Sequence, residues 1–263
     1  MFKREFRINL KSLIIWISVL LFTYILIFAV YPYLINEDTK NMLTQMMETM
    51  PKEILASFNM DIVGIESAYG WFKTEGYTFL TLIGGLYAAI LGSTILVKEE
   101  NDKTIEFLLS KPVSRNKVVS AKILCGILNI IIFISVIGLG NFTALKLSGE
   151  LDIKEFFMIS IIPLLLYLML FFITIFMSSF FKKTKKSMSA GMAIVFISYF
   201  MQIIGTMGEN IKFIKDISLF EFVSSRYIIL NGEFNLKYIL IGFAIIFICI
   251  IGLYKRYNTK EFI

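Results

Sequence analysis

Six long stretches of this sequence contain no Asp, Glu, Lys or Arg, and they decide what the chain can fold into. They cover residues 12–35, 76–97, 123–145, 156–181, 187–208 and 238–254. Each is close to the ~20 residues that an α-helix needs to cross ~30 Å of hydrocarbon. Of the 263 residues, 57% are hydrophobic and 17% are charged, which leaves no room for a large soluble domain. The sequence therefore predicts an all-α, polytopic membrane protein with six transmembrane helices in a single domain.

The positive charges predict how these helices are oriented. Residues 1–11, 98–122, 182–186 and 255–263 hold 17 of the 26 Lys and Arg residues. Cytoplasmic segments that flank membrane helices are enriched in Lys and Arg, so these four segments are expected in the cytoplasm, together with both termini. Residues 36–75 and 209–237 are then external. Because the positive charge flanks the membrane spans, it does not indicate a nucleic-acid partner.

The two external segments contain apolar patterns of their own. In residues 36–75, Met42, Met46 and Met50 share one helical face, and Pro51 separates this helix from a second short one, so we expect amphipathic helices near the outer leaflet. Residues 209–237 include a stretch that is too apolar for a solvated loop. Glu221 and Arg226 make a further crossing costly, and a short re-entrant helix is expected here.

Several chemical functions are excluded by the residue types that are missing. The sequence has no His and only two Cys residues, so no metal site and no Ser–His or Cys–His catalytic pair is expected. The six apolar stretches contain no carboxylate for a coupling ion. Energy for transport is therefore expected to come from outside the chain.

The spans do contain small and amide side chains. A stripe of small residues in 76–97 includes Gly85, Ala89 and Gly92, and the buried amides are Asn129, Asn141 and Gln202. Both features are typical of close helix packing in lipid. These six residues are therefore candidates either for helix interfaces, within or between subunits, or for a substrate path.

The segment 98–122 carries the most specific pattern. Its acidic first half has Ile105, Leu108 and Leu109 on one face, Pro112 ends that helix, and Ser114 is a plausible N-cap for the next. Together with the end of the preceding span, this segment resembles the ABC-2 type exporter permeases, which follow a pattern like E-E-x-x-G-T-x-E-x-L-L-S-x-P-V-S-R before a Lys. Lys103 stands where the family often has Gly. The resemblance rests on Glu99, Glu100, Thr104, Glu106, Leu108, Leu109, Ser110, Pro112, Val113, Ser114, Arg115 and Lys122.

The resemblance implies a type V exporter-like architecture and an ATP-driven transport function. Residues 98–122 would contain the coupling helix that docks on an ATPase, and residues 1–11 would form an interfacial connecting helix. The ATPase-coupling residues would be Glu99, Glu100, Thr104, Ile105, Glu106, Leu108, Leu109, Pro112, Ser114, Arg115 and Lys122.

The resemblance also implies the partners. The chain contains no Gly-Lys dipeptide and hence no phosphate-binding loop of the G-x-x-x-x-G-K-[ST] type. ATP and Mg²⁺ are therefore expected on a separate ATPase subunit, present in two copies, and no cofactor is expected on this chain. A second permease subunit, identical or paired, and membrane lipid complete the expected partners. The location implied is the bacterial plasma membrane. The alternatives are a non-transport scaffold or a channel-like component.

Overall fold

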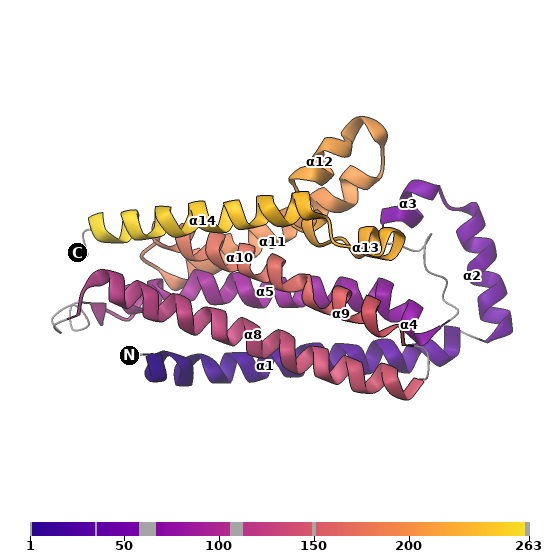
Figure 1. Cartoon of the computed structure of the whole chain (residues 1–263), viewed down its shortest axis with the longest axis horizontal. Coiled ribbons are helices and arrows are strands. Elements are labelled where there is room, and N and C mark those ends of the chain that lie inside the picture. Colours follow the sequence, from indigo (N-terminus) through magenta and orange to yellow (C-terminus); the bar gives the residue numbers. More distant parts are fainter. Residues whose placement is uncertain (1, 35, 58–66, 106–112, 149–150, 261–263) are drawn as a thin grey trace.

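The computed structural model is a bundle of long, roughly parallel helices (Figure 1). It describes residues 2–34, 36–57, 67–105, 113–148 and 151–260. Within them, six helical segments are long and apolar enough to cross a membrane: Phe2–Tyr33, Ala68–Ile95, Arg115–Leu147, Ile153–Ser178, Thr184–Thr206 and Leu236–Thr259. The all-α fold with six candidate spans is thus confirmed. Both termini lie at the same end of the bundle (Figure 1), as an even number of spans requires.

The first two spans begin earlier than the sequence pattern predicts. Helix α1 runs without a break over Phe2–Leu34, so residues 1–11 and 12–35 share one helix from Phe2 onward. The second span begins with α4 (Ala68–Trp71) and a short π-helix η1 (Phe72–Gly76), and these continue into α5 (Tyr77–Ile95). Charged residues Lys73 and Glu75 lie in this extension, which is why the uncharged stretch alone did not include it.

The third and fourth spans lie on either side of a short connection. Helix α8 covers Arg115–Ser148, and the fourth span consists of α9 (Ile153–Ile161) and α10 (Pro163–Ser178). The interruption between α9 and α10 falls directly before Pro163. Proline has no backbone N–H group, and its ring clashes with the carbonyl four residues earlier, so it interrupts a regular helix. The remaining spans are α11 (Thr184–Thr206) and α14 (Leu236–Thr259).

Short helices cover the end of the bundle opposite the termini (Figure 1). Helices α2 (Glu37–Thr49) and α3 (Lys52–Ser57) lie on either side of Pro51, where the sequence predicts two amphipathic helices. Between α11 and α14 the chain forms η2 (Glu209–Ile211), α12 (Lys212–Ile217), η3 (Glu221–Val223) and α13 (Ser225–Asn231). Phe220, Val223 and Ile228 are buried in this region. Entry of these short helices into the outer leaflet stays a prediction.

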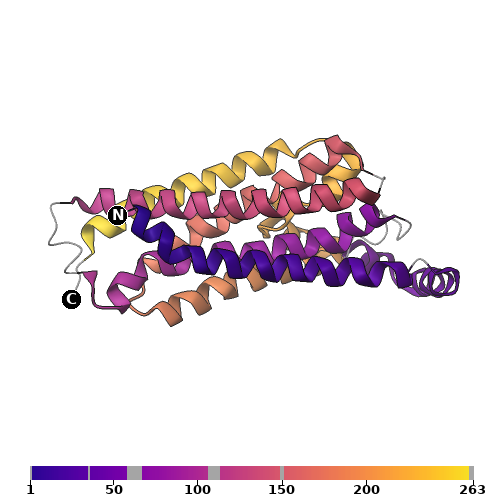
Figure 2. The same ribbon diagram turned by 90° about the horizontal axis from the view of Figure 1, so that it is seen from below.

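The centre of the bundle is α5, which packs against α10 and α11. Tyr167 on α10 donates a hydrogen bond to the carbonyl of Leu80 (2.7 Å), and Ser187 on α11 donates one to the carbonyl of Ser93 (2.8 Å). On the outside, α1 lies along α8 (Figure 2), and α1 exposes large apolar side chains such as Phe22 and Ile25. In a membrane protein such a surface contacts lipid or another subunit.

Candidate functional site

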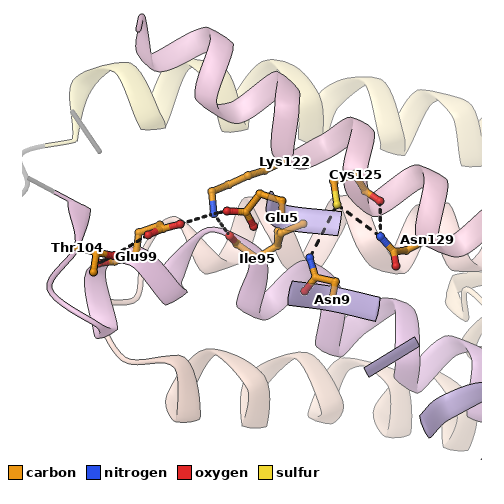
Figure 3. Close-up of polar contacts among 8 residues, drawn as sticks. All are labelled: Glu5, Asn9, Ile95, Glu99, Thr104, Lys122, Cys125 and Asn129. Carbon is orange, nitrogen blue, oxygen red and sulfur yellow. Dashed lines mark hydrogen bonds and ion pairs between the residues drawn. The ribbon is translucent and has the colours of Figure 1, made fainter. Parts of the chain in front are cut away.

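An extensive buried polar cluster lies at the end of the bundle that holds both termini. Its centre is Lys122 on α8, whose side chain is completely buried. The Nζ atom of Lys122 lies 3.2 Å from Glu99 Oε1 and 3.3 Å from Glu5 Oε1, and it donates a 2.6 Å hydrogen bond to the carbonyl of Ile95 (Figure 3). One ammonium group thereby joins α1, the end of α5, and α6 (Val97–Asn101).

The acceptors around Lys122 follow from local structure. Helix α5 ends at Ile95, so the carbonyl of Ile95 belongs to the last turn, where carbonyls lack a helical partner and the helix dipole attracts a cation. Glu5 is 4% exposed and Glu99 is 6% exposed. Removing one member of a buried ion pair lowers stability by about 3–5 kcal/mol, because the other charge is left buried without a partner. Glu5, Glu99 and Lys122 therefore hold each other in place.

Glu99 is also fixed from its other side by a turn after α6. The Thr104 hydroxyl donates to Glu99 Oε2 (2.6 Å), and the Thr104 amide donates to the Glu99 carbonyl (2.8 Å) (Figure 3). Burial alone would raise the pKa of the Glu99 carboxyl, but the Thr104 hydrogen bond and the Lys122 charge outweigh burial and lower this pKa below its usual 4.5. The carboxylate is therefore held ionised.

The turn itself is a Schellman motif, in which a left-handed residue ends a helix. The amide of Lys103 donates a hydrogen bond to the carbonyl of Glu100 (3.2 Å). Together with the hydrogen bond from the Thr104 amide to the Glu99 carbonyl, it forms the pair of bonds that defines this motif. Lys103 has φ 55°, and glycine is the usual residue in this conformation. The turn forms here with Lys in the position where the resemblance implies Gly.

A second polar group lies one turn further along α8. Asn129 donates to the carbonyl of Cys125 (2.8 Å) and lies 3.5 Å from its Sγ, and Asn9 on α1 approaches the same sulfur at 3.9 Å (Figure 3). Asn129 is completely buried, and its Oδ1 atom has no hydrogen-bond partner among the described residues. The α1–α8 contact thus includes several polar side chains near the termini.

The C-terminal end of α14 is held by the residues that flank segment 98–122. Arg115 donates to the carbonyls of Tyr257 (3.3 Å), Asn258 (3.0 Å) and Lys260 (2.8 Å). Lys260 Nζ in turn lies 2.6 Å from Glu100 Oε1 and donates to the carbonyl of Phe181 (3.3 Å). We call these contacts of Arg115, Lys260 and Glu100 the tail clasp. It joins α6, α8, the α10–α11 connection and α14.

A sequence comparison identifies the family of this chain. The sequence profile described as ABC-2 family transporter protein matches residues 1–251. The chain belongs to the ABC-2 transporter family. No curated protein and no solved structure matches it. The ABC-2 match covers both ends of the polar cluster, from Glu5 to Lys122, and extends into α14.

The structure brings together many of the coupling residues that the sequence of this ABC-2 protein suggests. Glu99, Thr104 and Lys122 meet in the buried cluster, and Glu100 and Arg115 meet the C-terminal tail. Ser114 is the N-cap of α8, because its hydroxyl accepts from the Lys117 amide (3.4 Å). Ile105 is buried against Val113 and Val118. Glu106, Leu108, Leu109 and Pro112 lie outside the described residues.

Two members of these contacts were missed from the sequence. Glu5 was grouped with the terminal segment 1–11, and Lys260 was counted only as a topology-determining cation. The available signal was a carboxylate, Glu5, among four cations at the N-terminus. Their partners could not be identified, because the contacts join segments more than 110 residues apart in sequence for Glu5 and 160 residues apart for Lys260.

The candidates for a helix interface or substrate path are placed mainly between helices of one chain. A methyl group on Gly92 would collide with Phe171 and Thr174 of α10, and one on Gly85 would lie 3.0 Å from Leu170. Gly191 of α11 approaches the carbonyl of Ala89. The small-residue stripe thus lies where α5 packs against α10 and α11 of the same chain.

The two remaining amides lie nearer the opposite end of the bundle. Asn141 is 4% exposed and lines an apolar groove between α1 and α8. Gln202 on α11 donates to Glu221 Oε2 (3.4 Å), and Lys215 lies 3.0 Å from the other oxygen of that carboxylate. Burial raises the pKa of Glu221, and the neighbouring Lys215 offsets part of this effect. Among the described residues there is no group of His, Cys, Asp or Glu that could hold a metal ion.

Proposed function

We propose that this ABC-2 protein is the permease subunit of an ATP-driven exporter, and that residues 98–122 couple it to a separate ATPase subunit. The observation that carries the proposal is that both ends of this segment contact other spans, through the buried ion pairs of Lys122 and through the partly buried Arg115. Lys122 at the start of α8 joins Glu99 of α6 to Glu5 of α1. Arg115, also at the start of α8, connects to the end of α14.

These contacts give a physical route for coupling. An ATPase that pushes on residues 98–122 moves α6 and the start of α8 together, because Lys122 bridges them to the end of α5. The same displacement reaches α1 through Glu5 and α14 through Arg115. Buried ion pairs transmit such a displacement well, because breaking one by moving a single partner is costly. The chain itself then needs no catalytic residue.

The functional unit in this proposal contains two permeases and two ATPase subunits, as the family resemblance implies, and the permeases can be identical or paired. The substrate path would lie at the permease dimer interface. The apolar surface of α1 supports this arrangement, since Phe22, Ile25 and Leu26 are all more than half exposed. Lipid would cover the rest of the outer surface.

Purification of the intact complex tests this proposal. A tagged chain is extracted from its native membrane in mild detergent, and the co-purifying proteins and the ATP hydrolysis of the sample are measured. We expect an ATPase subunit in a 1:1 ratio to the permease and ATP hydrolysis that depends on it. Purification of the chain with no ATPase subunit, under conditions in which it stays monodisperse, would favour the scaffold or channel-like alternative.

We further propose that the end with both termini faces the cytoplasm. The Lys and Arg distribution supports this orientation, and Met47 on α2 and Lys183 before α11 then lie on opposite sides of the membrane. Single cysteines at these two positions, in a variant without the two native cysteines, should react with a membrane-impermeant reagent from opposite sides. Labelling of both from one side would contradict the topology.

A further inference from the structure

An apolar groove runs along the outer half of α8, where this helix faces α9. It has a volume of about 480 Å³ and is lined by Leu139, Phe142, Phe156, Phe157 and Ile161, with Gly138 at its floor. The volume is within the ~300–1,000 Å³ typical of small-molecule sites. The groove forms where the fourth span is interrupted before Pro163, so that α9 and α10 are separate helices.

The space next to Gly138, which lines the groove, is not filled by any described part of the chain. A methyl group on Gly138 would meet nothing within 4 Å among the described residues, whereas one on Gly92 would collide with α10. Phe157 and Ile161 are each 58% exposed on the facing helix. The groove therefore has an accessible apolar wall and room for an elongated apolar group.

Two lysines lie at the end of the groove that is further from the termini. Lys146 is one turn beyond Phe142 on α8, and its Nζ lies 5.8 Å from the centre of the Phe142 ring. Lys154 is three residues before Phe157 on α9, a spacing that places both on the same face of the helix. Since α8 and α9 run in opposite directions, both cations are at the same end.

Two described carboxylates near these lysines, Asp152 and Glu155, form other contacts. Glu155 is 3.2 Å from Lys73, and Asp152 accepts the Glu155 amide as the N-cap of α9. No described carboxylate forms an ion pair with Lys146 or Lys154. The groove thus has apolar walls and two cations at the end that is further from the termini.

We propose that this groove binds one acyl chain of an anionic membrane phospholipid, with the headgroup phosphate at Lys146 and Lys154. An acyl chain gains no hydrophobic free energy by leaving the bilayer for an equally apolar groove. Selective binding therefore depends on shape and on the two cations, and the headgroup charge decides which lipid stays. This site does not depend on the proposed transport function.

The test measures phospholipid that stays with the purified full-length chain. The protein is extracted, exchanged into lipid-free detergent and analysed by mass spectrometry for bound lipid per chain. We expect about one anionic phospholipid per chain in the wild type. Gly138→Leu should reduce this amount at least fivefold, because the new side chain extends into the open space next to Gly138 and occupies part of the groove. Val136→Leu, which adds bulk elsewhere on α8, is the control.

The charge requirement has its own variants. Lys146→Gln combined with Lys154→Gln should remove the preference for anionic over zwitterionic phospholipid, measured after incubation with an equimolar mixture of the two. Lys237→Gln is the matched control, because Lys237 also lies over an aromatic ring, at 5.9 Å from the centre of Tyr238, but outside the groove.

Three outcomes would overturn the proposal. One is equal lipid retention in Gly138→Leu and the wild type, which would indicate non-specific lipid around the bundle. The second is an unchanged anionic preference in the double Gln variant. The third is a Gly138→Leu chain that changes from dimer to monomer while the wild type carries no lipid, because the groove would then be an interface between two copies.

Discussion

Lys103 adopts a backbone conformation that glycine would adopt at lower cost. Its φ of 55° ends α6 and directs Thr104 back to Glu99. For a residue with a Cβ atom, the left-handed region costs about 1–2 kcal/mol. The resemblance to ABC-2 permeases, where Gly is frequent at this position, therefore has a physical basis in the turn.

Replacing Lys103 tests this explanation. Lys103→Gly should preserve or increase the free energy of unfolding by up to about 1 kcal/mol, because the strain disappears. Lys103→Val should lower it, since a β-branched residue is the least compatible with positive φ. Thermal unfolding of the detergent-solubilised protein measures both. A stabilising Val variant would show that the turn is not left-handed in solution.

The pKa of Glu99 predicts how acid affects the buried cluster. Because the folded-state pKa lies below the usual 4.5, ionised Glu99 stabilises the fold above that pH, and this contribution is lost as pH falls through the folded-state pKa. The unfolding temperature should therefore fall as pH drops below about 4.5. The Glu99→Gln variant should have a lower unfolding temperature than the wild type at neutral pH, and this temperature should fall less as the pH is lowered. An identical acid response in both proteins would show that Glu99 is not the responsible group.

At the scale of helices, sequence patterns predicted the elements better than their ends. The uncharged stretches predicted all six candidate spans. The second span begins earlier than predicted, because Lys73 and Glu75 interrupt the apolar pattern while η1, which contains them, is helical. Lys73 forms an ion pair with Glu155 of α9. The two residues meet only when the chain folds, so the sequence does not reveal the pair.

The packing of α5 on α10 predicts different tolerance at two glycines. Gly92→Leu should destabilise the protein by about 1–3 kcal/mol or more, because the new side chain meets the backbone carbonyl of Phe171. Gly138→Ala should be neutral or slightly stabilising, because nothing lies near the new methyl group and alanine favours a helix. The fraction of monodisperse protein after heating measures both, and equal losses would contradict the packing.

For the whole molecule, the sequence pattern singled out residues 98–122 as the segment that resembles the family. It did not predict which other helices this segment contacts. The pattern in 98–122 pointed to Glu99, Arg115 and Lys122, and the structure places all three in contacts between spans. Glu5 and Lys260 could not be found from local patterns, since each is a charged residue near a terminus until folding brings it to its partner. The tail clasp thus makes the last turn of α14 part of the proposed coupling unit.

The central claim is that residues 98–122 dock on an ATPase and transmit its movement to the spans. The proposal assigns docking to Leu108 and Leu109, and burying a Leu side chain contributes roughly 1.5–3 kcal/mol. Glu106 would form an exposed ion pair worth about 0–1 kcal/mol. Apolar contacts should therefore dominate the affinity.

The most direct test is substrate-stimulated ATP hydrolysis by the complex reconstituted with Leu108→Asp/Leu109→Asp permease, measured beside Glu106→Ala as the control. The double Asp variant should insert and elute like the wild type, yet lose ATPase association and stimulated hydrolysis, while Glu106→Ala keeps both. Stimulated hydrolysis at the wild-type level in the double Asp variant would contradict the account and place the docking site elsewhere on the chain.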